Sequence, residues 1–424
     1  MRSRAVRGVF LLIVCVVLCL GANFLAFTID TPDMRKNAWQ GCLMLGEQGA
    51  TPQMVGGFKS SQLDNFTAAL ILKTAAYTGH ESLMVKALGG LRVEMAPEPG
   101  QSEWDAFCAY GDASESPTGS GVSYNRYWHG YTLPLRLALC VLDAANLQMM
   151  LYFAQMVLMC LVFFQMKARG IGHLIPGFFL AYFLLMPFAS GICLQYIPVS
   201  MLMLIACAMI LAWDLAIDRL ITLPAFFAAL GLFTNYFDLL TFPLVSLGFP
   251  LIILLALRMQ EGKNGKSLFW TTVCCGFAWA LGYGGMWALK WVICGLAFGW
   301  DAFFRVFGQI GLRASSNGGD LSRIGVLLSN LNIILAKKSY LLIIGLCTLV
   351  TLAPVARALG EKRSLCADLR ALNLLLPAAA VCLWYIVMAN HSFDHTYFTY
   401  RNAAVMVFAG FAFLSCLLKR GDRA

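Results

Sequence analysis

The sequence predicts an all-α integral membrane protein with about ten transmembrane helices and a long, partly helical first external loop. Two observations come from composition: 59% of the 424 residues are hydrophobic and only 12% are charged. The third is that apolar stretches recur near the roughly 20 residues that a helix needs to cross a bilayer. The expected spans are 7–27, 145–166, 173–190, 192–213, 220–237, 240–257, 268–297, 339–356, 371–389 and 402–418.

Basic residues occupy every second loop, which predicts the orientation of the chain. Because cytoplasmic loops carry an excess of Lys and Arg, both termini are expected in the cytoplasm of a multi-pass cell-membrane protein. The residues of this pattern are Arg2, Arg4, Arg7, Lys167, Arg169, Arg219, Arg258, Lys263, Lys266, Arg357, Lys362, Arg363, Arg370, Lys419, Arg420 and Arg423. The net charge of +9 does not indicate a nucleic-acid partner, because these residues flank apolar runs instead of forming one patch.

The span pattern divides the chain into four parts. These are an N-terminal signal-anchor helix (1–27), a large first extracytoplasmic loop (28–132), a multi-helix transmembrane domain (133–418) and a cytoplasmic tail (419–424). A cleaved signal peptide is the alternative for the first part, but no small-residue cleavage site follows the apolar run. The stretch 133–142 is too short to span and suits an interfacial helix, while 268–297 is long enough to tilt or break.

Two cysteines and two histidines raise questions of covalent or metal chemistry. Cys42 and Cys108 lie in the first loop, where a disulfide and two free thiols are both open. His391 and His395 have the spacing of a metal pair on one helical face. No Cys or acidic partner completes a ligand set, so we expect a hydrogen-bonded cluster and no metal or cofactor.

The predicted outer face collects polar residues from four segments, which are the first loop (28–132), the turn TNYFDLLTFP, the loop 298–338 and the sequence NHSFDH. Ionisable residues at a membrane edge are costly and commonly mark function, and Asp238 and Lys290 are the clearest cases. The alternatives are a helix-end carboxylate in water for Asp238 and a lysine snorkelling to the headgroups for Lys290. The segment YNRYWHGY offers aromatic planes beside polar groups, an arrangement that suits sugar rings and equally an interfacial aromatic belt. Its candidate binding residues are Asn125, Arg126, Tyr127, Trp128 and His129.

The start of the first loop resembles the GT-C class of integral-membrane glycosyltransferases. Pro32-Asp33, Ala38, Met44 and Gly49 match the class pattern, whereas Met34 stands where a second acid is common. The resemblance implies that Asp33 is the catalytic base, with Asp30 as the substitute. It also implies a polyprenyl-phosphate-linked sugar as donor, since an outward-facing enzyme has no access to cytoplasmic nucleotide-sugars.

Four phrases are similar to an uncharacterised group of bacterial polytopic membrane proteins. They are LDNFTAALIL (63–72), YNRYWHGYTLPLR (124–136), YFDLLTFPL (236–244) and NHSFDHTYFTYR (390–401). This resemblance bears on fold and site location, and it adds Asp64 to the substrate-binding candidates.

The expected function is therefore transfer of a sugar from a polyprenyl-phosphate carrier to an envelope glycan, lipid or protein, with membrane lipids as the surroundings. A base must take the proton of the acceptor hydroxyl, and cations must stabilise the leaving phosphate. The cationic candidates are Lys290, Arg305, Arg313 and Arg401, with His391, His395 and Asp238 in the same cavity wall. The main alternative is a transporter or flippase of a lipid-linked saccharide, although the sequence shows neither inverted repeats nor paired broken helices. An acyl- or phosphotransferase using His129 or His391 lacks a nucleophile motif.

Overall fold

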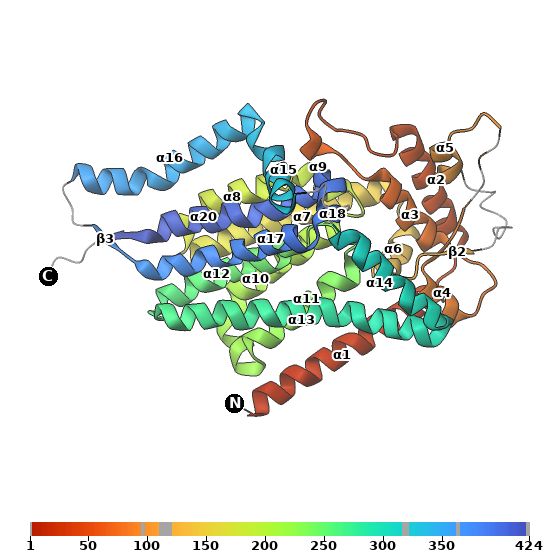
Figure 1. Ribbon diagram of the computed structural model, residues 1–424, viewed down its shortest axis with the longest axis horizontal. Coiled ribbons are helices and arrows are strands. Elements are labelled where there is room, and N and C mark those ends of the chain that lie inside the picture. Colours follow the sequence, from red (N-terminus) through yellow and green to blue (C-terminus); the bar gives the residue numbers. More distant parts are fainter. Residues whose placement is uncertain are drawn as a thin grey trace.

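The computed structural model describes residues 2–94, 97, 99–109, 121–315, 322–361 and 365–420. Within these ranges the chain is almost entirely helical (Figure 1). The helices before the first long internal span are α1 (Arg2–Ala26), α2 (Pro32–Gln48), α3 (Asn65–Ala76), α4 (Leu83–Gly89), α5 (Glu103–Cys108) and α6 (Thr132–Leu139). The later helices are α7 (Ala144–Ala168), α8 (Ile175–Leu184), α9 (Pro187–Ile192), α10 (Ile197–Leu220), α11 (Leu223–Phe237), α12 (Leu244–Gln260), α13 (Gly265–Phe298), α14 (Trp300–Ala314), α15 (Arg323–Leu335), α16 (Lys338–Gly360), α17 (Leu376–Val387), α18 (Ala389–Asp394), α19 (Thr396–Thr399) and α20 (Ala403–Leu417).

Strands and short 3₁₀ helices complete the described elements. Strands β1 (Leu91–Val93) and β2 (Gly121–Ser123) pair antiparallel, with Arg92 opposite Val122, and β3 (Leu365–Ala367) pairs antiparallel with β4 (Leu418–Arg420). The 3₁₀ helices are η1 (Lys59–Ser61), η2 (Gly172–Leu174), η4 (Leu369–Leu375) and η5 (Tyr400–Asn402).

Six of the described helical segments are long and apolar enough to cross a membrane. They are Ser3–Ala26, Ala144–Ala168, Ile197–Leu220, Gly265–Phe298, Leu369–Val387 and Thr396–Leu417. The pair α15 and α16 makes a seventh if it counts as one span, and three further apolar helices have only 10–17 residues. All ten predicted stretches therefore hold apolar helix, but the count of about ten spans is not confirmed, because length decides whether a helix crosses the hydrocarbon.

One predicted apolar stretch, 173–190, is broken, contrary to the expectation from sequence, and a second break lies just before the stretch 339–356. Met186 adopts φ 52° between α8 and α9, where the following Pro187 disfavours the α-helical conformation of the residue before it. Helices α15 and α16 bend by 81° around residues 336–337, where Lys337 donates a hydrogen bond to the Gly57 carbonyl of the first loop. The two breaks meet, since the Tyr340 hydroxyl at the start of α16 lies 3.0 Å from the Met186 sulfur. By contrast α13, the long predicted span, is one continuous helix of 34 residues.

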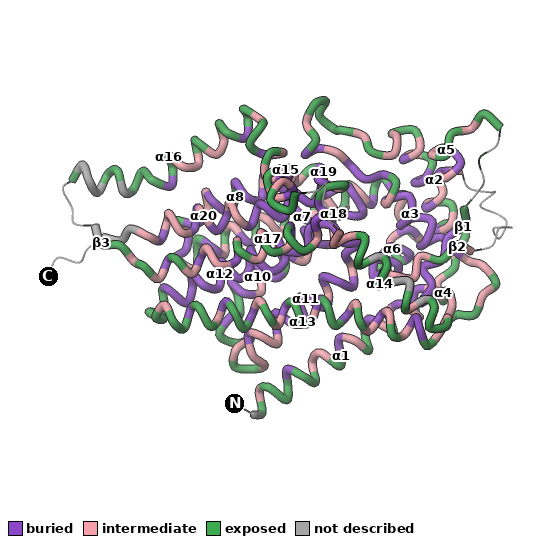
Figure 2. The backbone as a smooth tube through the Cα atoms, in the orientation of Figure 1, coloured by how far each residue is buried: buried purple, intermediate pink, exposed green. Residues whose placement is uncertain are grey.

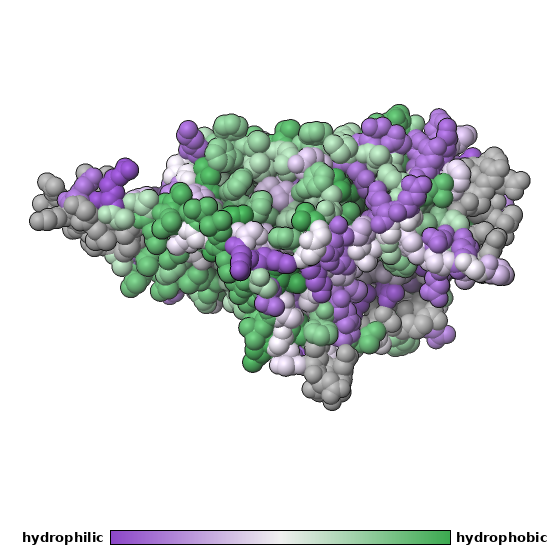
Figure 3. Space-filling view, turned by 90° about the horizontal axis from the view of Figure 1, so that it is seen from above, coloured by the Kyte–Doolittle hydropathy of each residue, from purple (hydrophilic) through white to green (hydrophobic). Residues whose placement is uncertain are grey.

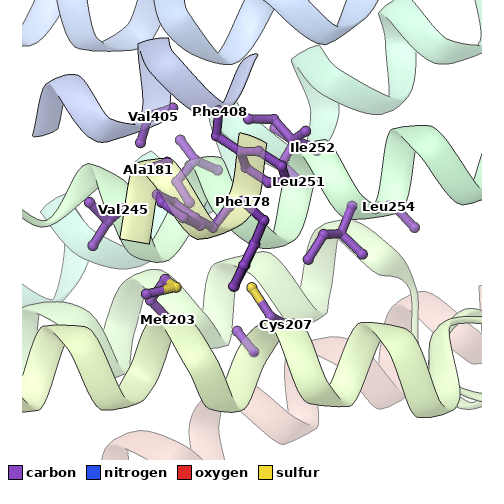
Figure 4. Close-up of a cluster of buried hydrophobic side chains, with 14 of the residues drawn as sticks. Phe178, Ala181, Met203, Cys207, Val245, Leu251, Ile252, Leu254, Val405 and Phe408 are labelled. Carbon is purple, nitrogen blue, oxygen red and sulfur yellow. The ribbon is translucent and has the colours of Figure 1, made fainter. Parts of the chain in front are cut away.

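The interior is an apolar core built mainly by α8, α10, α12 and α20 (Figure 4). Phe178 packs edge-on against both Phe249 and Phe408, with ring centroids 5.6 and 5.5 Å apart. Helices α11 and α13 approach so closely that a Cβ on Gly231 would lie 2.1 Å from the Trp279 carbonyl oxygen. Small residues allow such contact between membrane helices, where dispersion forces replace the hydrophobic effect as the main attraction.

The burial pattern separates this core from a lipid-accessible periphery. Buried residues follow α8, α10, α12 and α20, whereas α1, α13 and α16 present much exposed surface (Figure 2). Many of the exposed side chains are large and apolar, among them Phe10, Phe277 and Leu349. Figure 3 shows hydrophobic side chains over a broad part of one face, with hydrophilic ones gathered toward the first-loop end. This distribution is that of a multi-pass membrane protein.

The first loop folds into a helical body at one end of the membrane helices (Figure 1). Arg136 of α6 holds this body to α1, because its guanidinium donates to the carbonyls of Ala26 and Ile29 and also to that of Tyr77. The expected short helix at 133–142 is present as α6. Carbonyls at helix ends have no intrahelical partner, so this buried arginine satisfies the terminus of α1.

Candidate functional site

The four polar phrases of the sequence meet at the first-loop end of the molecule. Tyr397 donates a hydrogen bond to Asp64, which joins 390–401 to 63–72. His391 lies 2.8 Å from the Leu240 carbonyl, and the Gly130 amide donates to the Tyr236 carbonyl at 3.0 Å. Each phrase is therefore hydrogen-bonded to at least one other, and the candidate site is defined by this junction.

Asp64 is buried at the junction and caps α3. Its carboxylate accepts hydrogen bonds from the Thr67 amide (2.8 Å) and hydroxyl (3.0 Å) as well as from Tyr397 (3.3 Å). Burial raises the pKa of Asp64, while these hydrogen bonds and the nearby His395 oppose the rise. A carboxylate in this setting orders two segments that are far apart in the chain.

Asp238 is also buried, so it is not the helix-end carboxylate in water that the sequence left open. One carboxylate oxygen accepts from the Thr241 amide and hydroxyl at 2.8 and 2.6 Å, and the other from the Tyr283 hydroxyl at 3.4 Å. Burial raises the pKa of Asp238 to about 6, against the lowering effect of these hydrogen bonds. The group therefore titrates close to neutral pH, as a general base requires.

His391 in α18 and His395, the residue that follows this helix, have ring centroids 4.9 Å apart. The carbonyl of Leu240 can only accept, so Nε2 of His391 carries the proton and Nδ1 is the unprotonated nitrogen of the neutral ring. Burial lowers the pKa of both histidines, and the charge of Arg313 lowers each further. His395 stacks on Phe398 with centroids 5.1 Å apart, and the charges of Asp64 and Asp394 act on it in the opposite sense.

A cavity with about 400 Å³ of empty space, its open mouth included, lies beside these groups. Its wall is aromatic and cationic, formed by Arg126, Tyr127, Trp287, Trp291, Ile310, Arg313 and Met388. Arg313 donates to the Tyr127 hydroxyl at 2.7 Å, and Arg126 lies over the Tyr124 ring at 4.6 Å. Two guanidinium groups next to indole planes can bind an anionic ligand that also has an apolar face.

A larger groove, with about 1110 Å³ of empty space including its mouth, borders a second apolar cluster, which Tyr127, Trp287 and Met388 of the cavity wall also contact. It is lined by α6, α7 and α10, with Leu135, Leu151 and Leu194 shared between the groove and the cluster. Met150 and Ile205 at its rim are exposed on membrane-length helices. The groove is almost wholly apolar, so a hydrocarbon chain is the chemistry that fits it.

His129 contacts Tyr127 of the cavity wall and Tyr131 of the groove, and it is locked in place by hydrogen bonds. Nδ1 lies 2.6 Å from the Tyr131 hydroxyl and Nε2 lies 2.7 Å from the Tyr124 carbonyl, so Nε2 carries the proton and both nitrogens are engaged. Burial lowers the pKa of His129 to about 3. With φ 55° and no unoccupied nitrogen, His129 positions Tyr124 and Tyr131.

Lys290 is fully buried, so the snorkelling alternative is wrong. Its Nζ donates to the Leu88 carbonyl at 2.7 Å and lies 5.2 Å from the centre of the Trp128 ring. The Trp128 indole in turn donates to the Met286 carbonyl, and Cys294 reaches the Asn125 carbonyl. These contacts fasten α13 to the first loop, and Lys290 is not in the wall of the cavity.

Arg401 is likewise buried among backbone carbonyls. Its guanidinium donates to Leu185 (2.9 Å), Tyr397 (2.9 Å) and Ser60 (3.1 Å) and lies over the Tyr196 ring at 4.5 Å. It thus joins α8, η1 and the C-terminal segment away from the cavity wall. The side chain of Arg305 lies outside the described residues, although its backbone belongs to α14.

Asp30 and Asp33 lie at the start of α2, apart from the junction. Asp30 pairs with Arg35, and Asp33 is exposed in the first helical turn, where a carboxylate is favoured by the helix dipole. Among the described residues, no hydrogen bond links either aspartate to the cavity wall. Their catalytic role therefore stays a prediction from the resemblance.

The structure adds aromatic residues that the sequence argument missed. Trp287 and Trp291 stand one helical turn apart on α13 with ring centroids 5.4 Å apart, and Tyr283 connects them to Asp238. The sequence signal for this pair was the four-residue spacing of Trp287 and Trp291 near the outer end of the predicted span 268–297. Tyr397 lay inside a phrase already singled out. In the described chain, no group of three or more His, Cys, Asp or Glu side chains is placed to hold a metal ion.

Searches of protein-family models, of curated proteins and of solved structures found no match to this chain.

Proposed function

We propose that the protein is a membrane glycosyltransferase that uses a polyprenyl-phosphate-linked sugar. The observation that carries the proposal is that a cationic, aromatic cavity and an apolar groove both border one apolar cluster. A lipid-linked sugar has these same three parts: a hydrocarbon tail, a phosphate and a sugar ring. The groove suits the tail, the guanidinium groups suit the phosphate, and the indole planes suit the sugar.

The reaction would proceed by attack of an acceptor hydroxyl on the anomeric carbon. A carboxylate takes the hydroxyl proton while the bond from that carbon to the phosphate oxygen breaks, and the lipid phosphate leaves with the electron pair. Arg126 and Arg313 would stabilise the charge that grows on the leaving phosphate. Arginine suits this role because its planar fork matches phosphate oxygens.

The resemblance assigns the base to Asp33, with Asp30 as substitute. Asp238 is the carboxylate connected to the cavity, because Tyr283 donates to it and packs against Trp287 of the cavity wall, with ring centroids 5.6 Å apart. Asp33 has the exposure that an acceptor needs, whereas Asp238 has the raised pKa. The two assignments of the base therefore predict different effects of substituting Asp33 and Asp238 on turnover.

The test is turnover of a polyprenyl-phosphate sugar by the purified full-length protein, measured as release of the lipid phosphate. Asp33→Asn is expected to lower turnover about 10²–10⁴-fold, which is typical for loss of a general base. Glu103→Gln is the matched control, since it neutralises another exposed carboxylate of the first loop. A loss confined to Asp238→Asn would transfer the role to that residue, and full turnover in Asp30→Asn, Asp33→Asn and Asp238→Asn would exclude the mechanism.

The second candidate function is transport or flipping of a lipid-linked saccharide. It is favoured by the two helix breaks that meet at Met186 and Tyr340, since discontinuous membrane helices are typical of transporter sites. Movement of a labelled lipid-linked sugar across vesicles containing the protein, without release of lipid phosphate, would favour this function over transfer.

A further inference from the structure

A second polar cavity lies at the end of α10, away from the candidate site. It contains about 830 Å³ of empty space, its mouth included, and is lined by Arg169, Ala212, Trp213, Asp214, Leu215, Ala216, Arg219 and Leu220. The N-terminal arginines of α1 reach the same place, where Arg4 donates to the Asp218 carbonyl and Arg7 to the Arg219 carbonyl. None of these residues takes part in the proposed transfer reaction.

A kink in α10 lies in the wall of the cavity. Trp213 has non-helical dihedral angles (φ −137°, ψ 19°), which interrupt the helix one and a half to two turns before its end. The break frees the Leu211 carbonyl from the helical ladder, and Arg169 donates to that carbonyl at 2.6 Å. The arginine from the end of α7 is thereby drawn into the opening between the helices.

The charges around the cavity favour an anion. Asp214 is 1% exposed and pairs with Arg169 at 2.9 Å, while Arg258 lies 3.5 Å from its other oxygen and binds Glu261 more closely, at 2.7 Å. The acid therefore fixes the orientation of Arg169 instead of repelling an anionic ligand. Arg219 is exposed and has no side-chain partner among the described residues, so its guanidinium is available.

The rim of the cavity is apolar and faces the position of lipid. Trp213 and Leu220 are 58% and 61% exposed on α10, a helix of membrane-spanning length. A soluble anion would make no use of these side chains, whereas a phospholipid presents a phosphate and an acyl chain together. Basic pockets between membrane helices are a known way to bind anionic headgroups.

We propose that this cavity binds the phosphate headgroup of an anionic phospholipid, with Arg169 and Arg219 as its cationic partners. The acyl chains then lie along Trp213, Leu215 and Leu220. Occupation would fill the space under the kink and bridge α7 to α10, so the lipid acts as a structural ligand at the face of the membrane opposite the first loop.

The experiment follows the fluorescence of Trp213 in the full-length protein, reconstituted in vesicles of phosphatidylcholine with a minor fraction of phosphatidylglycerol. Bromine on the acyl chains of one lipid or the other quenches tryptophan on contact, and the difference between wild type and Trp213→Phe isolates residue 213. Brominated phosphatidylglycerol is expected to quench Trp213 more than brominated phosphatidylcholine at equal bromine content. The preference should fall about fivefold in Arg219→Gln, because one cation near a membrane surface is worth about that factor.

Two further variants test whether the lipid preference depends on the cavity itself. Lys266→Gln removes an exposed charge at the start of α13 on the same side of the protein and should leave the preference unchanged. Arg169→Gln also breaks the contact with Asp214, so Arg219→Gln carries the test if the former does not fold. Equal quenching by the two lipids, an unchanged preference in Arg219→Gln, or relief of quenching by added inorganic phosphate would overturn the proposal.

Discussion

Tyr397 donates a hydrogen bond to Asp64 across 333 residues of sequence, at a distance of 3.3 Å. The contact joins the acid that caps α3 in the first loop to the start of the last membrane-length helical segment. Arg401, one helical turn beyond Tyr397, binds the Ser60 carbonyl of the same loop. The helical body of the first loop is therefore held by the C-terminal part of the chain as well as by α1.

The first prediction concerns how much Asp64, with its hydrogen bond from Tyr397, contributes to the stability of the protein. Asp64→Ala removes a helix cap worth about 1 kcal/mol and also leaves buried donors without an acceptor, at about 1–3 kcal/mol. Asp143→Ala is the control, because Asp143 caps α7 through the same contact to an amide three residues later but is not buried. The unfolding midpoint in detergent should fall clearly more in Asp64→Ala. Equal losses would mean that the Tyr397 contact adds nothing to stability.

A second prediction tests the orientation inferred from the basic loops. A cysteine at Lys263 should react with a membrane-impermeant reagent only after the inner face is exposed, and a cysteine at Ser315 should react in intact cells. The labelling is measured as a mass shift of the protein, in a variant whose other accessible cysteines have been replaced. The reverse pattern would put the candidate site on the cytoplasmic face of the membrane and the lipid-binding cavity on the outer face.

The third prediction concerns Cys42 and Cys108, for which the sequence left a disulfide and free thiols open. In the structure both are free and buried, and burial raises the pKa of Cys42 to about 12 and that of Cys108 to about 11. Because the thiolate is the reactive form, neither should be alkylated in the folded protein at pH 8, and both should react after denaturation. Glu103→Cys supplies an exposed thiol in the same loop as the positive control. Recovery of a linked Cys42–Cys108 peptide without reductant would contradict this.

The fourth prediction is a pH dependence due to His129. Its pKa is about 3 in the folded protein and 6.5 in a model peptide, so between these values the unfolded chain binds a proton that the folded chain does not. The free energy of unfolding keeps its full His129 contribution above the pKa of this residue in the unfolded chain. It decreases as the pH drops below that value, by up to about 1.4 kcal/mol per pH unit. His129→Asn keeps a residue that tolerates the positive φ but cannot titrate. The unfolding midpoint of wild type should fall more steeply than that of His129→Asn from pH 7 to pH 4, and parallel curves would refute the assignment.

The residues of the predicted site fall into groups that the sequence could not distinguish. Asp64, Asp238, His391 and His395 were expected in one site. Tyr397 binds Asp64 and the Leu240 carbonyl binds His391, but none of the four is among the residues that line the cavity. Lys290 and Arg401 were expected to face a phosphate, yet both donate to backbone carbonyls in the interior. A buried cation and a ligand-binding cation look alike in sequence, because the difference lies in the surrounding carbonyls.

The sequence by itself determined the membrane class, the positions of the apolar stretches and the four polar phrases. Hydropathy and helix length are local properties, so a window of about 20 residues contains the information that places a membrane helix. Only the tertiary structure decided that α8 and α9 break at Met186 and that α15 and α16 bend, since these breaks are stabilised by contacts with Tyr340 and with the first loop. Tertiary contacts also decided which charges reach a cavity. Cavity walls form where distant segments leave space between them, and no single stretch of the chain encodes that space.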